Sequence, residues 1–253
     1  MAAKGSNEIS SCLYHCLNRV KLDGKKKIRL VADGCGGQNK NSILLGMVAK
    51  WLHETTQNIE EVEIVYPVTG HSFIPPDRVF AFVEKQIKRL ETISNPQTYI
   101  DIMGTNATIR RLVTEVPIFD WKSACKDVLK TTQTLHFQIS KTKRIVLNRT
   151  NRRKILVRGE ISYRNDICNS LSITKRGKHI SGIQPNIIEA RFNVKAEKLT
   201  DVKKLLEKHY GEAWSDLPDL KYYKTVLAHN ENLPEQQEVE DDPEMPEEIF
   251  DFV

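Results

Sequence analysis

The sequence has no long apolar run, few cysteines and few aromatic residues. Its longest apolar stretch, residues 43–49, is far shorter than the roughly 20 residues that a membrane-spanning helix needs. The opening residues MAAKGSNEIS are polar, so we expect no signal peptide. Five cysteines without a secretion signal predict free thiols rather than a disulfide framework. We therefore expect a protein outside the membrane, secreted and disulfide-scaffold classes.

Charge, by contrast, is abundant and unevenly distributed. The 253 residues are 40% hydrophobic and 28% charged, with a net charge of +5, which permits a packed core. Residues 231–253 contain ten acidic residues and no Lys or Arg, whereas the preceding 230 residues contain 38 basic and 23 acidic residues. A basic body predicts a polyanionic partner, because each neutralised phosphate releases counterions. An ordinary solvated surface explains the charge on its own equally well.

The first ninety residues predict alternating helices and strands. After a Ser6/Asn7 cap region, an apolar stripe from residue 9 to residue 20 predicts a helix. A buried strand over 27–32, a helix over 43–52, a strand over 62–68 and a helix over 77–90 follow. The order α-β-α-β-α predicts parallel strands with right-handed crossovers.

The rest of the chain changes character. A less periodic connector leads to a short helix over 120–129, and runs with period-2 alternation then predict a small antiparallel sheet. The predicted strands of this sheet are residues 135–139, 144–147, 155–163 and 170–174, and two closing helices follow at 196–209 and 217–228. The resulting division is 1–92, a connector 93–118, a basic β-rich module 119–180, a helical closing segment 181–230 and an acidic tail 231–253. The tail is rich in Pro, Glu and Gln, so we expect it to be disordered and to bind basic partners or mask the basic surface.

Four residues could form a metal site: Asp33, His71, Asp77 and Glu84. Asp33 follows a predicted parallel strand, and ligands gather at the carboxyl ends of such strands. Asp77 and Glu84 are seven residues apart, which places them on one helix face. Carboxylates that converge in this way bind Mg²⁺ and can support phosphodiester chemistry. The alternative is that Asp77 caps its helix and Glu84 is a solvated residue beside basic neighbours.

The loop over residues 33–41 has a second interpretation. A strand, a glycine-rich loop and a helix also form phosphate-binding loops. The P-loop pattern fails because Asn39-Lys40-Asn41 replaces Gly-Lys-Ser/Thr, and the dinucleotide pattern fails because Asn39 occupies the third glycine position. The sequence therefore argues against a nucleotide-binding loop.

Two motifs together carry a family resemblance. The sequence DGCGGQNKN at residues 33–41 and the sequence GHSFIPPDRVFAFVEK at residues 70–85 resemble the signature of a transposon-derived family with an RNase H-like (DDE transposase-type) domain. The segments KGSNEISSCL at 4–13 and KLTDVKKLL at 198–206 are also similar to that family. The resemblance thus covers most of residues 4–225 and leaves the acidic tail outside.

The resemblance implies roles for the four residues. Asp33 would be the second catalytic acid, either Asp77 or Glu84 would be the third, and His71 would lie near the metal. The implied cofactor is Mg²⁺ or Mn²⁺, weakly bound. An RNase H-like domain begins with a three-stranded meander that carries the first carboxylate, whereas no strand-like run precedes residues 27–32 here. We therefore expect the first acidic residue to be missing and the chain alone not to cut or join DNA, and an unpaired sheet edge would favour self-association.

Basic residues predict the nucleic-acid contacts. Nine candidates lie in the glycine loop and the predicted β-rich module: Lys40, Lys141, Lys143, Arg144, Arg149, Arg152, Arg153, Lys154 and Arg158. Contacts of this kind bind phosphates without reading bases. A solvated sheet face explains the same residues equally well. The basic run 152–154 also predicts nuclear residence.

The leading hypothesis is a transposase-derived α/β protein that retains nucleic-acid affinity and part of a metal site, with DNA as the partner. The first alternative is an active nuclease or integrase whose missing carboxylate lies upstream or on a partner chain. The second is a non-enzymatic interaction protein that acts through the acidic tail.

Overall fold

A computed structural model describes residues 5–68, 75–164, 168–188, 194 and 196–231. The chain divides into two compact units. We call residues 5–68 and 111–188 the sheet unit, and residues 75–110, 194 and 196–231 the helical unit. Each unit is described by itself. None of the described helices has the length and apolar character that a bilayer crossing requires.

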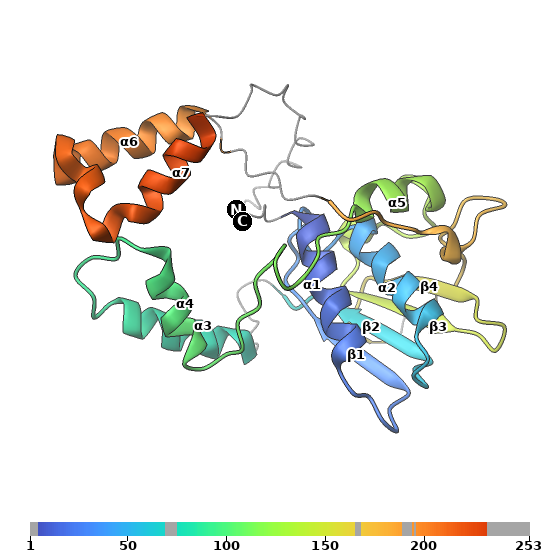
Figure 1. Ribbon diagram of the computed structural model, residues 1–253. Helices are drawn as coiled ribbons and strands as arrows, with labels where there is room; N and C mark the ends of the chain where they lie inside the picture. The colour runs from blue at the N-terminus through green and yellow to red at the C-terminus, as the bar shows by residue number, and fades with distance from the viewer. Residues whose placement is uncertain (1–4, 69–74, 165–167, 189–193, 195, 232–253) are drawn as a thin grey trace, which may run out of the picture. The chain divides into compact units, whose positions relative to one another are not determined.

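The sheet unit contains one mixed four-stranded sheet (Figure 1). Its strands are β1 (Lys27–Val31), β2 (Glu61–Val65), β3 (Arg144–Arg149) and β4 (Ile155–Glu160), in the spatial order β1-β2-β3-β4. The first pair is parallel and the other two are antiparallel. The prediction of an α/β protein with a parallel pair at its start is therefore confirmed.

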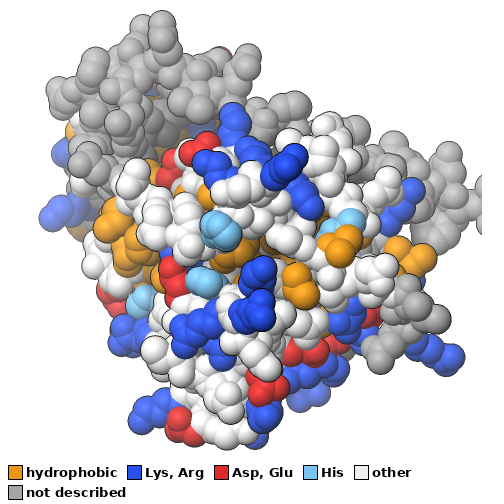
Figure 2. All heavy atoms as spheres, turned by 90° about the vertical axis from the view of Figure 1, so that its right-hand side faces the viewer, with side chains coloured by type: hydrophobic (Ala, Val, Ile, Leu, Met, Phe, Trp, Pro, Cys, Tyr) orange, Lys and Arg blue, Asp and Glu red, His pale blue; other side chains and the backbone are white. Residues whose placement is uncertain are grey.

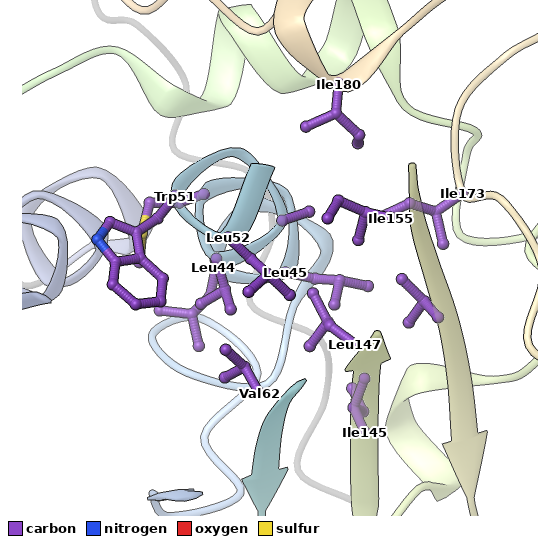
Figure 3. Close-up of a cluster of buried hydrophobic side chains, with 14 of the residues drawn as sticks. Leu44, Leu45, Trp51, Leu52, Val62, Ile145, Leu147, Ile155, Ile173 and Ile180 are labelled. Atoms are coloured by element: carbon purple, nitrogen blue, oxygen red, sulfur yellow. The ribbon is translucent and has the colours of Figure 1, made fainter. Parts of the chain in front are cut away.

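Helix α2 (Ser42–Glu54) links the two parallel strands and forms the centre of the core. Every residue from Leu44 to Leu52 is buried, because the sheet lies on one side of α2 and two other helices pack against it. These helices are α1 (Ser6–Arg19) and α5 (Trp121–Val128). Figure 3 shows the side chains of α2 meeting those of β2, β3 and β4. Apart from Lys50, which pairs with Glu54 at 2.6 Å, the buried stretch is apolar on all sides, as expected of a helix inside a protein.

A glycine sets how closely α2 and α5 approach. A Cβ atom on Gly46 would lie 2.5 Å from Sγ of Cys125 and 2.7 Å from Cδ1 of Leu129. These separations are far below ordinary van der Waals contact. Glycine in the middle of α2 lowers the intrinsic stability of the helix. The missing side chain allows α5 to pack directly against the backbone of α2.

The two faces of the sheet differ in character, as strand alternation requires. The apolar face carries alternate residues of each strand and packs into the main core: Ile28, Leu30, Val62, Ile64, Ile145, Leu147, Ile155 and Val157. The opposite face carries charged residues that pair across the strands. We call this second set the ion-pair ladder; it comprises Lys27, Arg29, Glu63, Arg144, Arg158 and Glu160.

The predicted separate antiparallel sheet is wrong. Residues 144–149 and 155–160 form β3 and β4 of the same sheet, with β3 paired to β2. Residues 135–137 form bends and Ile139 begins a 3₁₀ helix (Ile139–Lys141), and the segment 170–174 makes only two isolated bridges. The reason is that β2 is apolar on one face and acidic on the other, and β3 matches both faces in register: Val62 faces Leu147, and Arg144 pairs with Glu63.

Strand β1 was predicted to be buried, but it is half-exposed with alternating burial. It lies at the outer edge of the sheet, so only one of its faces reaches the core. The predicted stripe on α1 is also partly wrong. Leu17 is buried, as are Ser10 and Ser11, whereas Cys16 and Val20 are exposed. The N-cap is Gly5 rather than the predicted Ser6/Asn7 region.

The helical unit contains α3 (Pro75–Ile87), α4 (Pro96–Gly104), α6 (Ala196–Tyr210) and α7 (Lys221–Glu231). The helices predicted at 77–90, 196–209 and 217–228 are confirmed in outline, with two 3₁₀ turns preceding α7. The predicted connector contains α4, whose N-cap Asn95 accepts a hydrogen bond from the backbone N–H of Gln97. Leu206, Trp214 and Leu220 form a small core of this unit. Residues 232–253 of the acidic tail lie outside the described residues.

Candidate nucleic-acid interface

The loop after β1 is shaped by its own side chains. Asp33 is exposed, and its Oδ1 accepts hydrogen bonds from Nδ2 of Asn39 at 2.5 Å and from the backbone N–H of Cys35 at 3.4 Å. The carbonyl of Cys35 in turn accepts the backbone N–H groups of residues 38–40. The loop therefore folds into a compact turn that presents Asp33 at the carboxyl end of β1.

The N-terminus of α2 is already occupied by a side chain. Oδ1 of Asn41 accepts the backbone N–H groups of Ile43 at 3.0 Å and Leu44 at 2.9 Å, which satisfies helix amides that would otherwise be free. Nδ2 of Asn41 donates to the Gly36 carbonyl and to Oγ of Ser6. A phosphate-binding loop needs free amides at this position. The structure thus agrees with the failed nucleotide-binding patterns of the sequence.

Two lysines and two tyrosines lie together at the end of the sheet where β1 and β2 finish. Nζ of Lys40 lies 5.2 Å from the ring centroid of Tyr66, and Nζ of Lys143 lies 5.3 Å from the ring centroid of Tyr163. The Tyr163 hydroxyl donates to the Tyr66 carbonyl at 2.8 Å, and the Tyr66 hydroxyl donates to the Asn39 carbonyl at 3.1 Å. Lys40, Tyr66, Lys143 and Tyr163, together with Asp33, are called the carboxyl-edge cluster.

Burial differs across this cluster. Tyr66 is 3% exposed, and burial raises the pKa of its hydroxyl far above the usual value. Lys40 is half-buried, donates to the Ser140 carbonyl at 2.6 Å, and has a pKa lowered by burial. Lys143 and Lys141 are exposed. The cluster therefore contains two lysines that lie against tyrosine rings, and Lys141 is exposed two positions before Lys143.

Two of the arginines predicted to contact nucleic acid belong to the ion-pair ladder instead. Arg144 is 12% exposed and pairs with both Glu63 and Glu160, and Arg158 pairs with Glu160 at 2.7 Å. Glu63 and Glu160 are almost fully buried. Burial raises the pKa of Glu63, but hydrogen bonds from Arg29 and Lys27 outweigh it and hold the pKa below its ordinary value. Arg144 and Arg158 thus neutralise buried acids.

Arg149 also has a structural role. Its Nη1 donates to the carbonyls of Leu52 at 3.2 Å and Thr55 at 2.9 Å, and its Nη2 donates to the carbonyl of Gln57 at 3.0 Å. The last carbonyls of a helix lack helical partners and carry partial negative charge. Arg149 therefore stabilises the C-terminal end of α2. The sequence could not predict this role, because the three carbonyl groups belong to residues more than 90 positions away.

The remaining three candidates lie in the turn between β3 and β4. Arg152, Arg153 and Lys154 are exposed, and the carbonyl of Arg153 contacts Nδ1 of His53 at 2.8 Å. This turn lies at the opposite end of the sheet from the carboxyl-edge cluster, because Asn148 pairs with Glu61 at the start of β2. Figure 2 shows Lys and Arg side chains spread over the side of β3 and β4, with fewer acidic side chains between them. The predicted basic set is thus divided into two separate surfaces and a buried network.

The predicted metal residues fall in different parts of the chain. Asp33 belongs to the sheet unit, Asp77 and Glu84 lie on α3 of the helical unit, and His71 lies outside the described residues. Glu84 pairs with Lys88 at 2.8 Å, and that hydrogen bond lowers the pKa of Glu84. Within the described ranges, no group of three His, Cys, Asp or Glu side chains is arranged to hold a metal ion.

A family match covers the chain from α1 to the turn between β3 and β4 and includes α3 and α4 of the helical unit. The family described as a domain of unknown function, DUF7869, matches residues 1–154, which is more than half of the chain. The chain belongs to this family. Comparison with curated proteins and with solved structures finds no match. The matched region of this DUF7869 member contains Asp33, Lys40, Tyr66 and Lys143 of the carboxyl-edge cluster, and it ends at Lys154 of the β3–β4 turn.

Proposed function

We propose that this DUF7869 protein is a transposase-derived, RNase H-like protein that binds nucleic acid through the carboxyl-edge cluster and is not catalytic as this chain alone. The observation that carries the proposal is the convergence of lysines and tyrosines at the carboxyl ends of β1 and β2, where parallel α/β proteins place their ligands. The α-β-α-β-α order with a parallel strand pair supports the RNase H-like assignment.

The cluster suits a phosphate backbone better than a base edge. Lysine ammonium groups act as positive point charges toward phosphates. The tyrosine rings hold Lys40 and Lys143 in place, which reduces the entropy lost when a phosphate binds. Both tyrosine hydroxyls already donate hydrogen bonds inside the protein. We therefore expect binding that depends strongly on salt and weakly on sequence.

Removing the two ring-held lysines tests the proposal. The variant Lys40→Gln/Lys143→Gln should bind a 20-base-pair DNA at least tenfold more weakly at about 50 mM salt, and the slope of log affinity against log salt should fall by about 2. Fluorescence anisotropy of the full chain between about 50 and 300 mM salt measures both quantities.

The β3–β4 turn supplies a matched control. Arg152→Gln/Lys154→Gln removes the same charge at the opposite end of the sheet, from residues that are exposed, and should change the slope little. If both double variants lost the same DNA affinity, the binding would be a general attraction to a basic surface and not a property of the carboxyl-edge cluster. No binding by the wild-type chain at low salt would eliminate the nucleic-acid function.

The metal part of the proposal depends on Asp33. This carboxylate is exposed at the end of β1, and within the described residues it belongs to no group of three His, Cys, Asp or Glu side chains that could hold a metal ion. A single carboxylate leaves most of the coordination sphere of Mg²⁺ or Mn²⁺ to water and to phosphate oxygens. We therefore propose an ion that is weakly held by Asp33 and shared with the bound nucleic acid.

Paramagnetic broadening is sensitive enough for such a weak ion. Substoichiometric Mn²⁺ should broaden the amide NMR signals of residues 33–39, and Asp33→Asn should abolish the effect because it removes the charge but keeps the shape. Asp23→Asn, in a loop before β1, is the control and should leave the broadening intact. Identical broadening in the wild-type and Asp33→Asn proteins would disprove a role for Asp33.

A further inference from the structure

The outer edge of β1 presents unpaired backbone groups. The carbonyl of Lys26 accepts hydrogen bonds from Glu60 and Glu61, and the backbone N–H of Ala32 donates to Val65. Backbone groups point to alternate sides along a strand. Residues 26, 28, 30 and 32 therefore face β2, and the N–H and C=O groups of Lys27, Arg29 and Val31 face away from it. Within the ranges that the structure describes, β1 has no second neighbouring strand.

The side chains of β1 specify what could pair with this edge. On the apolar face, Ile28 and Leu30 are half-buried and pack against the main core. On the other face, the side chains of Lys27 and Arg29 are 50% and 60% exposed. A strand added here would extend the apolar face with apolar residues, and it would place its alternate side chains beside two positive charges.

The pairing of β1 with β2 shows which side chains form ion pairs with Lys27 and Arg29. Lys27 faces Glu61 and Arg29 faces Glu63 in the parallel register, with ion-pair distances of 2.6 Å and 2.8 Å. The hydrogen bond from Lys27 to Glu61 is the largest cause of a raised pKa of Lys27. Arg29 uses only its Nε in this contact, so its two Nη groups remain available for a second carboxylate.

A second copy of the same chain is a poor partner for this edge. Pairing β1 with another β1 would bring Lys27 and Arg29 of one chain beside those of the other. Like charges on neighbouring strands are destabilising, and positive charges on edge strands are a common protection against self-pairing. The charge pattern therefore selects an acidic strand.

We propose that the free edge of β1 binds an extended segment of a partner protein in which acidic residues alternate with β-branched apolar residues, as they do in β2. Main-chain hydrogen bonds to Lys27, Arg29 and Val31 supply the affinity. The alternate side chains supply the selectivity, as in other cases of strand addition to a sheet. This inference is independent of the proposed nucleic-acid function.

A labelled peptide that copies residues 60–66, Glu-Glu-Val-Glu-Ile-Val-Tyr, tests the proposal with the full-length protein. Amide hydrogen exchange followed by NMR should slow at least tenfold at Arg29 and Val31 when the peptide is present in excess. The amides of Ile28 and Leu30, which already face β2, should not change. A control peptide with lysines at the positions of Glu61 and Glu63 should bind at least tenfold more weakly in anisotropy.

Two protein variants complete the design. Val31→Pro removes one outward N–H group without touching an ion pair, and proline is tolerated at such edge positions, so it should weaken the peptide at least fivefold in a folded protein. Arg29→Glu should reverse the preference between the two peptides. Unchanged exchange at Arg29 and Val31, or equal binding of both peptides, would overturn the proposal. Protection of the Arg29 and Val31 amides in the absence of peptide would also overturn it. Protection that grows with protein concentration would indicate pairing between two copies, and protection independent of concentration would indicate that a segment of the same chain covers the edge.

Discussion

Replacing Arg144 with methionine is expected to lower the free energy of unfolding by about 3–5 kcal/mol. Arg144 lies between two almost fully buried carboxylates: its Nη1 is 3.2 Å from Oε1 of Glu63, and its Nε donates to Oε2 of Glu160 at 2.6 Å. Methionine fills much of the space but leaves both acids without this partner. Glu63 keeps Lys27 and Arg29, and Glu160 keeps Arg158. Both buried carboxylates nevertheless lose the least exposed of their cationic partners, and such a loss costs more than the loss of an exposed pair. Urea unfolding followed by far-UV circular dichroism measures the change.

Lys143→Met is the matched control for this prediction. It removes one positive charge from the adjacent residue, which is exposed, and should change stability by less than about 0.5 kcal/mol. The double variant Arg144→Met/Glu160→Leu should lose less than the sum of its single variants, because it removes a buried charge together with its partner. If Arg144→Met were no more damaging than Lys143→Met, the ion-pair ladder would not support the sheet.

The ion-pair ladder also determines how the stability of the folded protein changes with pH. The pKa of Glu63 is held below its ordinary value in the folded chain, so its contribution to stability is present above the unfolded pKa. That contribution is lost as pH falls through the folded pKa. Because the hydrogen bond from Arg29 is a main cause of the lowered pKa of Glu63, the stability of an Arg29→Met variant should fall less steeply on acidification than that of the wild-type protein, as urea unfolding at several pH values measures.

Trp121→Ala should destabilise the sheet unit by about 3–5 kcal/mol. The indole is fully buried, and it packs edge-on against Tyr14 and Phe119 with ring centroids 5.1 Å and 5.9 Å away. Its Nε1 donates to Oγ of Ser11 at 3.1 Å. Truncation would remove the aromatic packing between α1 and α5 and leave a large cavity in the core.

Trp121→Phe separates packing from hydrogen bonding at this position. Phenylalanine retains an aromatic ring but cannot donate to Ser11, so we expect a loss of about 1–2 kcal/mol. The urea concentration at the unfolding midpoint should decrease in the order wild type, Trp121→Phe, Trp121→Ala, provided that the three proteins have the same m-value. Equal midpoints for the two variants would show that cavity formation contributes nothing.

Local patterns predicted several elements correctly. The stripe over residues 43–52 indicated α2, and the short β-branched run that follows indicated β2 parallel to β1. Asp120 at the start of the predicted helix 120–129 is the N-cap of α5. Propensity, capping and periodicity act within a few residues, so a sequence window contains the information that they need.

The predicted functional residues depended on longer-range contacts. Nine basic residues were predicted to contact nucleic acid, yet Arg144 and Arg158 neutralise buried acids and Arg149 stabilises the end of α2. Lys40 and Lys143 were predicted from charge alone, whereas their tyrosine partners come from other segments of the chain. The tyrosines were missed because a single aromatic residue in a strand or loop carries no signal of its partner.

The amino-acid sequence by itself determined the order of helices and strands in the first ninety residues, the excess of positive charge and the acidic character of the end of the chain. Only the tertiary structure decided that 144–149 and 155–160 join the first sheet, which lysines reach its carboxyl edge, and which edge of β1 is open. The physical reason is that strand partners and ion pairs are chosen by which surfaces bury each other. That choice is made between residues roughly eighty positions apart, such as Glu63 and Arg144.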